Sequence, residues 1–345
     1  MAQSPSDFRS DTVTRASATM RQLMAEASVG DDVLDGDPTV QRLEQAAADW
    51  LGMEGALFVP SGTMANQVAL GAWTRPGDEI IVQRFAHVTT FEAGAAGYLH
   101  GLQSMTVGGE TGDFSLEQVR SCVRPTFIHC PPTSLICLEQ THNYAGGRVL
   151  PLQVFEEVSG FAREAKIPLH LDGARLANAA VASGVSARTY ASHVDSVSLC
   201  FSKGLGAPVG SIIAGSGEFL ERARLVRKRL GGWMRQSGHL AAAALHALEN
   251  NVARLAEDHT LARQLAERLG ALPGLETEPK LVETNIVMVQ VQHPDFDAKA
   301  LSEALAQEGV LVMPMGERRL RFVTHLDVGA ADLDRLETAA KSLLG

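Results

Sequence analysis

Short apolar runs, many of them β-branched, alternate with longer stretches of mixed polarity through the first two thirds of the chain. Several runs are apolar throughout, which is typical of strands buried on both faces of a sheet. The alternation favours an α/β architecture with a mostly parallel sheet. Strands are predicted at Ala56–Val59, Glu79–Val82, Thr126–His129, Ser134–Glu139, Leu169–Asp172, Ser196–Phe201 and Ser211–Ala214.

Helical patterns lie between these runs. One helix is predicted to begin at Asp37-Pro38, because Asp is a favoured N-cap residue and Pro is favoured at the first helical position. Two further helices are predicted over Thr63–Trp73 and Leu152–Lys166. The segment His239–Leu269 lacks proline and is rich in Ala, Leu, Glu and Arg, which predicts one long helix with a break near Asp258.

The pattern changes after this long helix and predicts a second, smaller domain. Its expected elements are strand Asn285–Val291, helix Asp297–Glu308, strands near Val310–Met313 and Leu320–Thr324, and a last helix from Asp332. We therefore predict a large α/β domain with an N-terminal arm over residues 1–250 and a small α+β domain over residues 251–345.

Composition and charge exclude several classes of protein. The chain has 345 residues, and 45% are hydrophobic and 20% charged, which is typical of a folded protein with a large core. Its formal net charge of -10 is unfavourable for general binding to nucleic acid or anionic membranes. No apolar run approaches the roughly 18 residues of a membrane span. The first residues, Met1–Asp7, lack the basic and apolar regions of a signal peptide.

The four cysteines match no zinc or redox spacing. We expect them to be reduced structural thiols in a cytoplasmic protein. No other cluster of ligand residues suggests a metal ion, and none is expected.

Lys203 follows the apolar strand Ser196–Phe201 and precedes the glycines of Gly204-Leu205-Gly206. A lysine at the end of a buried strand is costly unless it has a partner or a task. Desolvation lowers the pKa of such an amine, which can then form an imine with an aldehyde. A surface lysine in a strand-to-loop turn explains this segment equally well.

Asp172 and Arg175 end the strand Leu169–Asp172, and functional groups collect at the carboxyl ends of strands in open α/β sheets. A buried carboxylate could keep the nitrogen of a pyridine cofactor protonated. Arg175 is suited to bind a carboxylate with two hydrogen bonds. The alternatives are a helix N-cap for Asp172 and a surface ion pair for Arg175.

The segment Ser61-Gly62-Thr63 joins strand Ala56–Val59 to a helix, and backbone N–H groups at such a helix start can bind an anion. Simple helix capping is the alternative. No lysine completes a nucleoside-triphosphate loop here, and no dinucleotide fingerprint of glycines is found. Lysine, acid and anion cradle together, each at a strand end, predict a site for pyridoxal 5′-phosphate (PLP). His87, a few residues after Glu79–Val82, could stack on the pyridine ring and move protons, although a lone loop histidine is usually a surface residue.

With these residues in place, the sequence resembles the threonine aldolases, which belong to the aspartate-aminotransferase-like (fold type I) PLP enzymes. The resemblance covers almost the whole chain. The matching segments are Arg9–Thr14, Val29–Val33, Asp37–Thr39, Ser61–Thr63, Ala86-His87, Glu139–Asn143, Asp172–Arg175, Ser202–Gly206, Met234–Gly238 and Arg321–Asp327.

The resemblance implies a role for each matched residue of the cofactor site. Lys203 would form an imine with PLP, Asp172 would pair with the pyridine nitrogen, and His87 would stack on the ring. Gly62 and Thr63 would hold the phosphate.

For the substrate, the resemblance implies that Ser10, Arg175 and Arg321 bind the carboxylate and that His142 lies near the hydroxyl group. Arg175 also counts among the residues around the cofactor. Lys228 and Arg235 would reach the phosphate of a neighbouring subunit, which implies a homo-oligomer, usually a tetramer.

The implied activity is the cleavage of L-threonine, L-allo-threonine and related β-hydroxy-α-amino acids to glycine and an aldehyde. His87, His142 or a bound water could be the base that takes the hydroxyl proton. The alternatives are β-elimination, transamination, or PLP binding without turnover. Leu34-Asp35 stands where the family often has tyrosine and glycine, and Trp233 where it often has glycine, so we expect an effect on substrate range.

Overall fold

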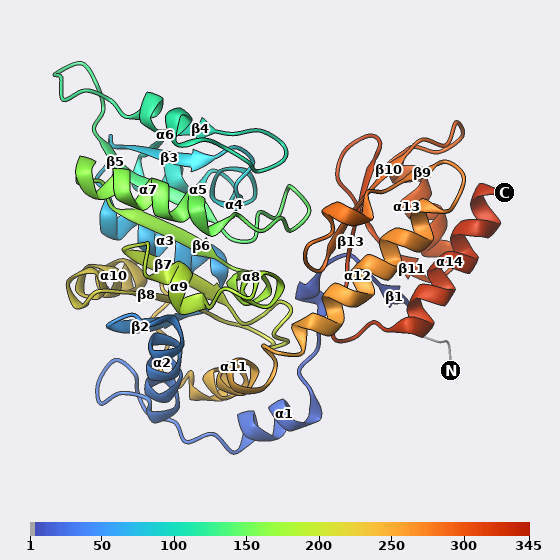
Figure 1. Cartoon of the computed structure of the whole chain (residues 1–345). Helices are drawn as coiled ribbons and strands as arrows, with labels where there is room; N and C mark the ends of the chain where they lie inside the picture. Colours follow the sequence, from blue (N-terminus) through green and yellow to red (C-terminus); the bar gives the residue numbers. More distant parts are fainter. Residues whose placement is uncertain (1–3) are drawn as a thin grey trace.

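The computed structural model of the protein describes residues 4–345, and a seven-stranded sheet forms the centre of its larger part (Figure 1). The strand order is β2-β8-β7-β6-β5-β3-β4. Strands β4, β3, β5, β6 and β7 are parallel, whereas β8 is antiparallel to both of its neighbours. The strands are β2 (Gly55–Val59), β3 (Glu79–Gln83), β4 (Gln103–Val107), β5 (Thr133–Glu139), β6 (Leu169–Gly173), β7 (Ser196–Cys200) and β8 (Ser211–Gly215).

The prediction of an α/β fold with a mostly parallel sheet is confirmed, and both faces of the sheet are covered. Successive residues of a strand point to opposite faces. Phe58 therefore packs into one apolar cluster, and Leu57 and Val59 pack into another on the other side. This double burial explains why the strand sequences are apolar throughout.

Helices pack on the sheet and around its edges. Asp37 caps α2 by accepting hydrogen bonds from the backbone N–H groups of Thr39 and Val40, and Pro38 is the first helical residue, as predicted. The helices of the large part are α1 (Ala18–Ala25), α2 (Pro38–Leu51), α3 (Gly62–Trp73), α4 (His87–Thr90), α5 (Ala95–His100), α6 (Leu116–Cys122), α7 (Leu152–Ala165), α8 (Leu176–Ser183), α9 (Ala187–Ala191), α10 (Gly217–Arg229) and α11 (Gly238–Asn250).

The smaller part contains a four-stranded sheet of order β12-β13-β10-β9, with helix α12 running toward it from the large part (Figure 1). Strand β1 (Ser6–Asp7) pairs in parallel with β11, and Phe8 lies in the core of this part. The elements are α12 (Leu255–Gly270), β9 (Leu275–Glu276), β10 (Ile286–Val291), α13 (Ala298–Gln307), β11 (Val310–Leu311), β12 (Met313–Pro314), β13 (Arg319–Val323) and α14 (Ala330–Leu344).

The domain boundary at residues 250 and 251 stays a prediction. The N-terminal strand packs with the small part, although it lies at the start of the sequence and was predicted to belong to the large domain. Two short 3₁₀ turns, Asp11–Val13 and Pro279–Leu281, complete the described elements.

Two expectations were wrong, and one strand of the large sheet was not predicted. Thr126–His129 is not a strand, and Phe127 and Ile128 are exposed in a loop bounded by Pro125 and Pro131. Proline cannot donate to a strand ladder, which explains the loop. Strand β4 was not predicted, because it is a partly exposed edge strand with polar residues.

The second wrong expectation concerns the long helix. The segment His239–Leu269 forms two helices, and the break lies at residues 251–254 rather than at Asp258, which is inside α12. Asn251 at the break donates a side-chain hydrogen bond to Leu205 O (2.7 Å). Asparagine has a lower helix propensity than alanine or leucine, which favours a helix end at this position.

The topology brings several loops to one edge of the large sheet. The carboxyl ends of parallel strands β3, β5, β6 and β7 lie at the same edge. Strand β2 ends there as well, because the two antiparallel steps through β8 restore its direction. No helix within residues 4–345 is long and apolar enough to cross a bilayer.

Candidate functional site

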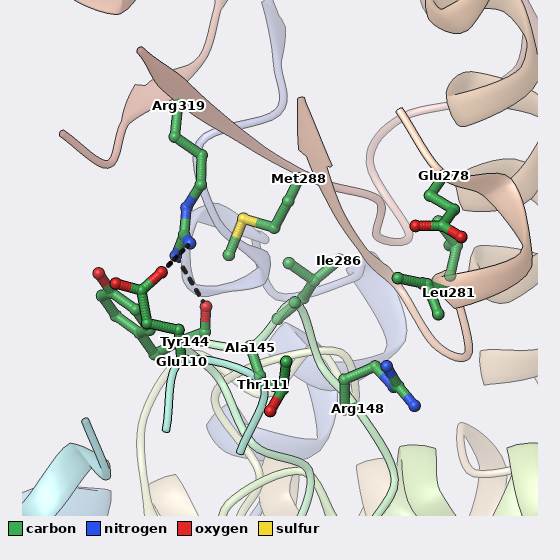
Figure 2. A pocket seen from close by; sticks show the side chains of 12 residues that line it. Glu110, Thr111, Tyr144, Ala145, Arg148, Glu278, Leu281, Ile286, Met288 and Arg319 are labelled. Carbon is green, nitrogen blue, oxygen red and sulfur yellow. Dashed lines mark hydrogen bonds and ion pairs between the residues drawn. The ribbon is translucent and has the colours of Figure 1, made fainter. Parts of the chain in front are cut away.

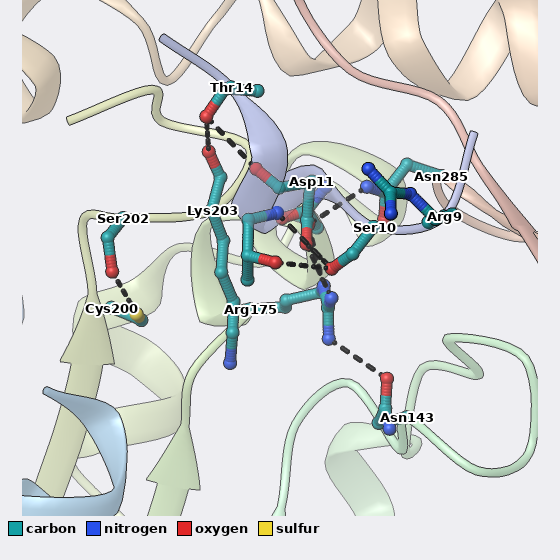
Figure 3. A network of polar contacts seen from close by, with 12 residues as sticks. Arg9, Ser10, Asp11, Thr14, Asn143, Arg175, Cys200, Ser202, Lys203 and Asn285 are labelled. Carbon is teal, nitrogen blue, oxygen red and sulfur yellow. Dashed lines mark hydrogen bonds and ion pairs between the residues drawn. The ribbon is translucent and has the colours of Figure 1, made fainter. Parts of the chain in front are cut away.

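Lys203 lies directly after β7, at the edge where the strand ends meet. Its charge acts on the carboxyl groups of Asp11 and Asp172 and on His87, so the fold brings these groups together. Its backbone oxygen accepts hydrogen bonds from Gly206 N (2.8 Å) and from Thr14 Oγ1 (3.4 Å). Figure 3 shows the extended Lys203 side chain, and its amino group makes no ion pair within the described part of the chain.

Asp172 ends β6 and is buried. Its Oδ2 accepts a hydrogen bond from Asn66 Nδ2 (2.7 Å), and its Oδ1 accepts one from Ala174 N (3.0 Å). Burial raises the pKa of the Asp172 carboxyl, but the charges of His87 and Lys203 and these hydrogen bonds outweigh it and hold the pKa below its ordinary value. Asp172 is therefore an anion with lone pairs left for one more donor.

Asn66, on α3, links Asp172 to a second buried acid. Its Nδ2 also donates to Glu92 Oε1 (2.8 Å), and its Oδ1 accepts from Ser198 Oγ (3.2 Å). Gln67 Nε2 donates to Glu92 Oε2 (2.6 Å), so both oxygens of Glu92 accept hydrogen bonds from α3. These two hydrogen bonds fix the orientation of the Glu92 carboxylate. Both donors on α3 are neutral amides, so no basic residue of this helix pairs with Glu92.

His87 begins α4 and is fixed at two atoms. Its backbone N donates to Glu139 Oε2 (2.5 Å), and its Nδ1 pairs with Glu92 Oε1 (2.7 Å). Burial lowers the pKa of the His87 imidazole, but the hydrogen bond to Glu92 and the charge of Asp172 raise it above the ordinary value of 6.5. Because a carboxylate is an acceptor only, Nδ1 carries a proton and Nε2 has the lone pair of the neutral ring.

His142 has the opposite arrangement. It lies in the loop after β5, where its backbone N donates to Arg148 O (2.9 Å). Its Nδ1 accepts a hydrogen bond from Ala145 N (3.2 Å), so the proton of the neutral ring is on Nε2. Nε2 is buried and has no partner within residues 4–345. His142 therefore presents an N–H donor rather than a lone pair.

Arg175 and Arg321 come from different parts of the molecule and meet at one atom. Arg175 Nη1 and Arg321 Nη1 each lie 3.2 Å from Asn143 Oδ1. The other edge of Arg175 is occupied, since its Nε and Nη2 donate to the two oxygens of Asp11 (2.8 and 2.7 Å; Figure 3). The expected binding of a substrate carboxylate by two hydrogen bonds from Arg175 is thus restricted to Nη1.

The start of α3 has features of a phosphate-binding site. Ser61 caps the helix by accepting from Met64 N, and the N–H groups of Gly62 and Thr63 have no backbone acceptor among residues 4–345. Ser211 Oγ is buried without a partner there, and a Cβ atom on Gly62 would lie 3.7 Å from it. An unpaired hydroxyl beside a helix N-terminus fits a phosphate group. With Lys203 and Asp172, the residues present fit PLP.

One group of residues in the described chain has the composition of a metal site, namely His87, Glu92 and Asp172. Nδ1 of His87 pairs with Glu92, and Asn66 donates a hydrogen bond to Glu92 and to Asp172.

The remaining predicted residues make other contacts. Ser10 Oγ accepts from Thr12 N (3.2 Å) as a helix cap and lies 3.5 Å from Asp11 Oδ1. Arg235 pairs with Asp31 (3.0 Å), and Lys228 lies over the ring of Trp233. Within one chain, Lys228 and Arg235 are therefore not brought to the cluster by any described contact.

Two regions flagged as departures from the family pattern lie on adjacent loops. Leu34 is 76% exposed in the turn after Asp31. Trp233 donates from Nε1 to Asp32 Oδ2 (2.7 Å). Their effect on substrate range stays a prediction.

A cavity of about 250 Å³ lies between the His142 loop and the small part (Figure 2). None of the predicted cofactor or substrate residues lines it, so it is not the catalytic site. Its wall supports that site, because Arg319 Nη2 donates to Tyr144 O (3.0 Å) and its guanidinium packs on the Tyr144 ring. This contact attaches the His142 loop to β13, the strand that carries Arg321.

Several residues of the site were not assigned a role from sequence. Asp11 and Asn143 lie inside matched segments, and Glu92 follows His87 by five positions. An acid within an otherwise apolar or hydroxyl-rich segment was the available signal. Its partners, however, come from distant parts of the chain and become visible only in the fold.

The chain is similar to known proteins over most of its length. The family described as beta-eliminating lyase matches residues 7–294. The low-specificity L-threonine aldolase 1 of Arabidopsis thaliana is 42% identical over 334 residues, which cover 95% of this chain and 93% of that protein. The low specificity L-threonine aldolase of Escherichia coli K12 is 44% identical over 328 residues, which cover 95% and 96%. A Leishmania major threonine aldolase has a common fold, with a TM-score of 0.83, 20% identity and coverage of 99% and 100%.

We predict that Lys203→Ala abolishes the visible absorption band of the cofactor imine, because alanine has no amine to condense with the aldehyde. Absorption spectra of both proteins, purified with added PLP, measure this. Lys166→Ala, at an exposed lysine, is the control and should keep the band. Retention of the wild-type band in Lys203→Ala would rule out Lys203 as the anchor.

Proposed function

The chain belongs to the threonine aldolases of the beta-eliminating lyase family, with the fold type I architecture of PLP enzymes, and we propose that it cleaves L-threonine, L-allo-threonine and related β-hydroxy-α-amino acids to glycine and an aldehyde. The observation that carries the proposal is the convergence of Lys203, Asp172 and His87 with two arginines from different parts of the chain.

When bound, PLP supplies an aldehyde that condenses with the substrate amino group and a ring that takes up the electrons released when a bond to Cα breaks. Lys203 would carry this aldehyde in the resting enzyme. Asp172 would keep the pyridine nitrogen protonated, since it is a buried anion with free lone pairs. The N–H groups at the start of α3 would hold the phosphate.

The arginines orient the substrate through its carboxylate. Arg321 Nε is buried without a partner in residues 4–345, so a carboxylate oxygen would satisfy it. Arg175 adds Nη1 at the same place. Holding the carboxylate fixes rotation about the bond between nitrogen and Cα, and the Cα–Cβ bond can then be aligned for cleavage.

The two histidines divide the proton chemistry. His87 Nε2 has the lone pair and takes the proton of the β-hydroxyl group, while His142 Nε2–H donates a hydrogen bond to the same oxygen. The Cα–Cβ bond breaks, the β-carbon leaves as the aldehyde, and the proton held on His87 Nε2 passes to Cα to give glycine. His142 is therefore a positioning donor, and a bound water is not required as the base.

Incubation with L-threonine is expected to release acetaldehyde and glycine in equal amounts. Coupled reduction of the aldehyde and amino-acid analysis measure the two products. The alternatives give other products, since β-elimination and transamination yield keto acids, the former with ammonia. Absence of aldehyde from every β-hydroxy amino acid in a panel of threonine and phenylserine diastereomers would reject the aldolase function.

The division between the histidines predicts different pH profiles. His87→Asn should lower kcat by roughly 10²–10⁴-fold, the contribution of a general base. In the wild type, kcat/KM should fall as the pH decreases through the raised pKa of His87, because the protonated ring cannot accept a proton. Glu92→Gln should move this acidic limb to lower pH, because it removes the group that raises the pKa.

His142→Asn serves as the comparison. It should lower kcat only about tenfold, the value of one hydrogen bond of roughly 1.4 kcal/mol, and leave the acidic limb in place. An acidic limb that persists unchanged in His87→Asn, together with its loss in His142→Asn, would reverse the assignment.

We further propose a cytoplasmic homotetramer in which Lys228 and Arg235 reach the phosphate of a neighbouring subunit. Thr63 and Lys228 are exposed and the Arg235 side chain is 57% exposed, so all three are accessible to another chain. Large apolar side chains are also exposed at Leu34 and Tyr98. The four unpaired cysteines, two of them buried, support a reducing compartment.

Light scattering of the holoenzyme should give a mass four times that of the 36.8 kDa chain. Arg235→Ala should lose PLP on dialysis faster than the wild type, whereas Arg222→Ala, at another exposed arginine, should not. A monomeric mass, or equal PLP retention in both variants, would contradict the shared site.

A further inference from the structure

Asp11 is the most enclosed acid at the substrate end of the site. It has no exposed surface and lies in the N-terminal segment, at the start of the 3₁₀ turn that follows strand β1 by a few residues. Its carboxyl group accepts two hydrogen bonds from Arg175 of the large part and one from Asn285 Nδ2 of the small part (3.2 Å). Three separate stretches of the chain therefore meet at this carboxylate (Figure 3).

The charges around Asp11 are unequal. Arg175 and Arg321 are both buried beside it, with exposures of 5% and 7%. Burial lowers the pKa of Arg175, but Asp11 raises it above its ordinary value. Burial and the charge of Arg175 lower the pKa of Arg321 to about 10, against the effect of Asp11. The negative charge of Asp11 thus neutralises the positive charge of Arg175. The positive charge of Arg321 is not neutralised in this way and favours the binding of an anion.

The hydrogen bonds follow the same division. Asp11 occupies the Nε–Nη2 edge of Arg175, which is the edge that would bind a carboxylate with two parallel bonds. Two residues earlier, Arg9 O accepts from Arg321 Nη2 (3.2 Å). Arg321 Nε has no partner in residues 4–345. The N-terminal segment therefore contacts both arginines. It occupies the Nε–Nη2 edge of Arg175, and it leaves Nε of Arg321 available to a ligand.

We propose that Asp11 is a positioning residue for aldol cleavage. Because Asp11 occupies the Nε–Nη2 edge of Arg175, the substrate carboxylate can bind only Arg321 and Nη1 of Arg175. This restriction fixes the angle between the Cα–Cβ bond and the plane of the cofactor ring. This inference rests on the proposed function, because only bond cleavage at Cα makes that angle decisive.

A purely structural role for Asp11 makes a different prediction. A buried pair that only fastens the N-terminal segment would, when broken, loosen the whole site and weaken ligand binding and turnover together. A positioning role instead predicts that loss of the Asp11 charge frees the Nε–Nη2 edge of Arg175. The site then binds a carboxylate as tightly as before or more tightly, but it holds the substrate at an angle that is wrong for cleavage.

The experiment compares the Asp11→Asn and wild-type holoenzymes. We expect kcat for L-threonine to fall about 100-fold, as for a small misplacement of reacting groups. The dissociation constant of glycine, measured by calorimetry, should stay within about threefold of the wild type or decrease, because the net positive charge of the pocket rises.

Ser6→Ala is the matched control. Ser6 Oγ donates to Asp332 Oδ1 (2.6 Å), so this serine also fastens the N-terminal segment to the small part but does not contact either arginine. Its kcat and glycine affinity should change by less than about twofold. Weaker glycine binding by more than about tenfold in Asp11→Asn, or an unchanged kcat, would overturn the positioning role.

A second pair of variants keeps the proposal testable if Asp11→Asn does not fold. Arg321→Lys should weaken glycine binding at least about tenfold, and more than Arg175→Lys does, because the carboxylate is expected on Nε of Arg321 and on only one nitrogen of Arg175. The reverse order would overturn the proposal. Glycine binding needs no cleavage, so an enzyme that binds glycine but cleaves no substrate would refute the proposed function alone.

Discussion

The buried ion pair between Asp11 and Arg175 joins the N-terminal segment, the large sheet and the small part at the substrate end of the site. Taking two charges out of water costs several kcal/mol for each ion, and the cost is offset only where hydrogen bonds are complete. Here both carboxylate oxygens and the whole Nε–Nη2 edge are used. The pair therefore fixes the position of the N-terminal segment relative to Arg175 and Asn285 at the site.

The cofactor end of the site depends on a second set of buried charges. Asp172 and Glu92 are held at a fixed separation by Asn66, which donates to both. Glu139 holds the backbone N–H groups of His87 and Asn143 with its two oxygens (2.5 and 2.8 Å). Acidic side chains from neighbouring strand ends and loops thus orient the groups that accept and donate protons in the reaction. Because these strand ends meet at the carboxyl edge of the sheet, the site lies there.

The sequence predicted features that depend on local pattern. The apolar strands and the Asp37-Pro38 helix start are found as expected, because burial on two faces and N-capping act within a few residues. The prediction of a strand at Thr126–His129 was wrong, because this apolar run lies between prolines in an exposed loop. The tautomers of the histidines and the closed fork of Arg175 could not be predicted, since Glu92, Ala145 and Asp11 approach them only through the tertiary fold.

A crystal structure of the wild-type holoenzyme with bound glycine tests the central claim most directly, since it shows which arginine receives the carboxylate. We expect the glycine carboxylate within hydrogen-bond distance of Arg321 Nε, while Nε and Nη2 of Arg175 remain on Asp11. A structure in which Arg175 leaves Asp11 and turns its fork to the glycine carboxylate would contradict the role of the buried pair.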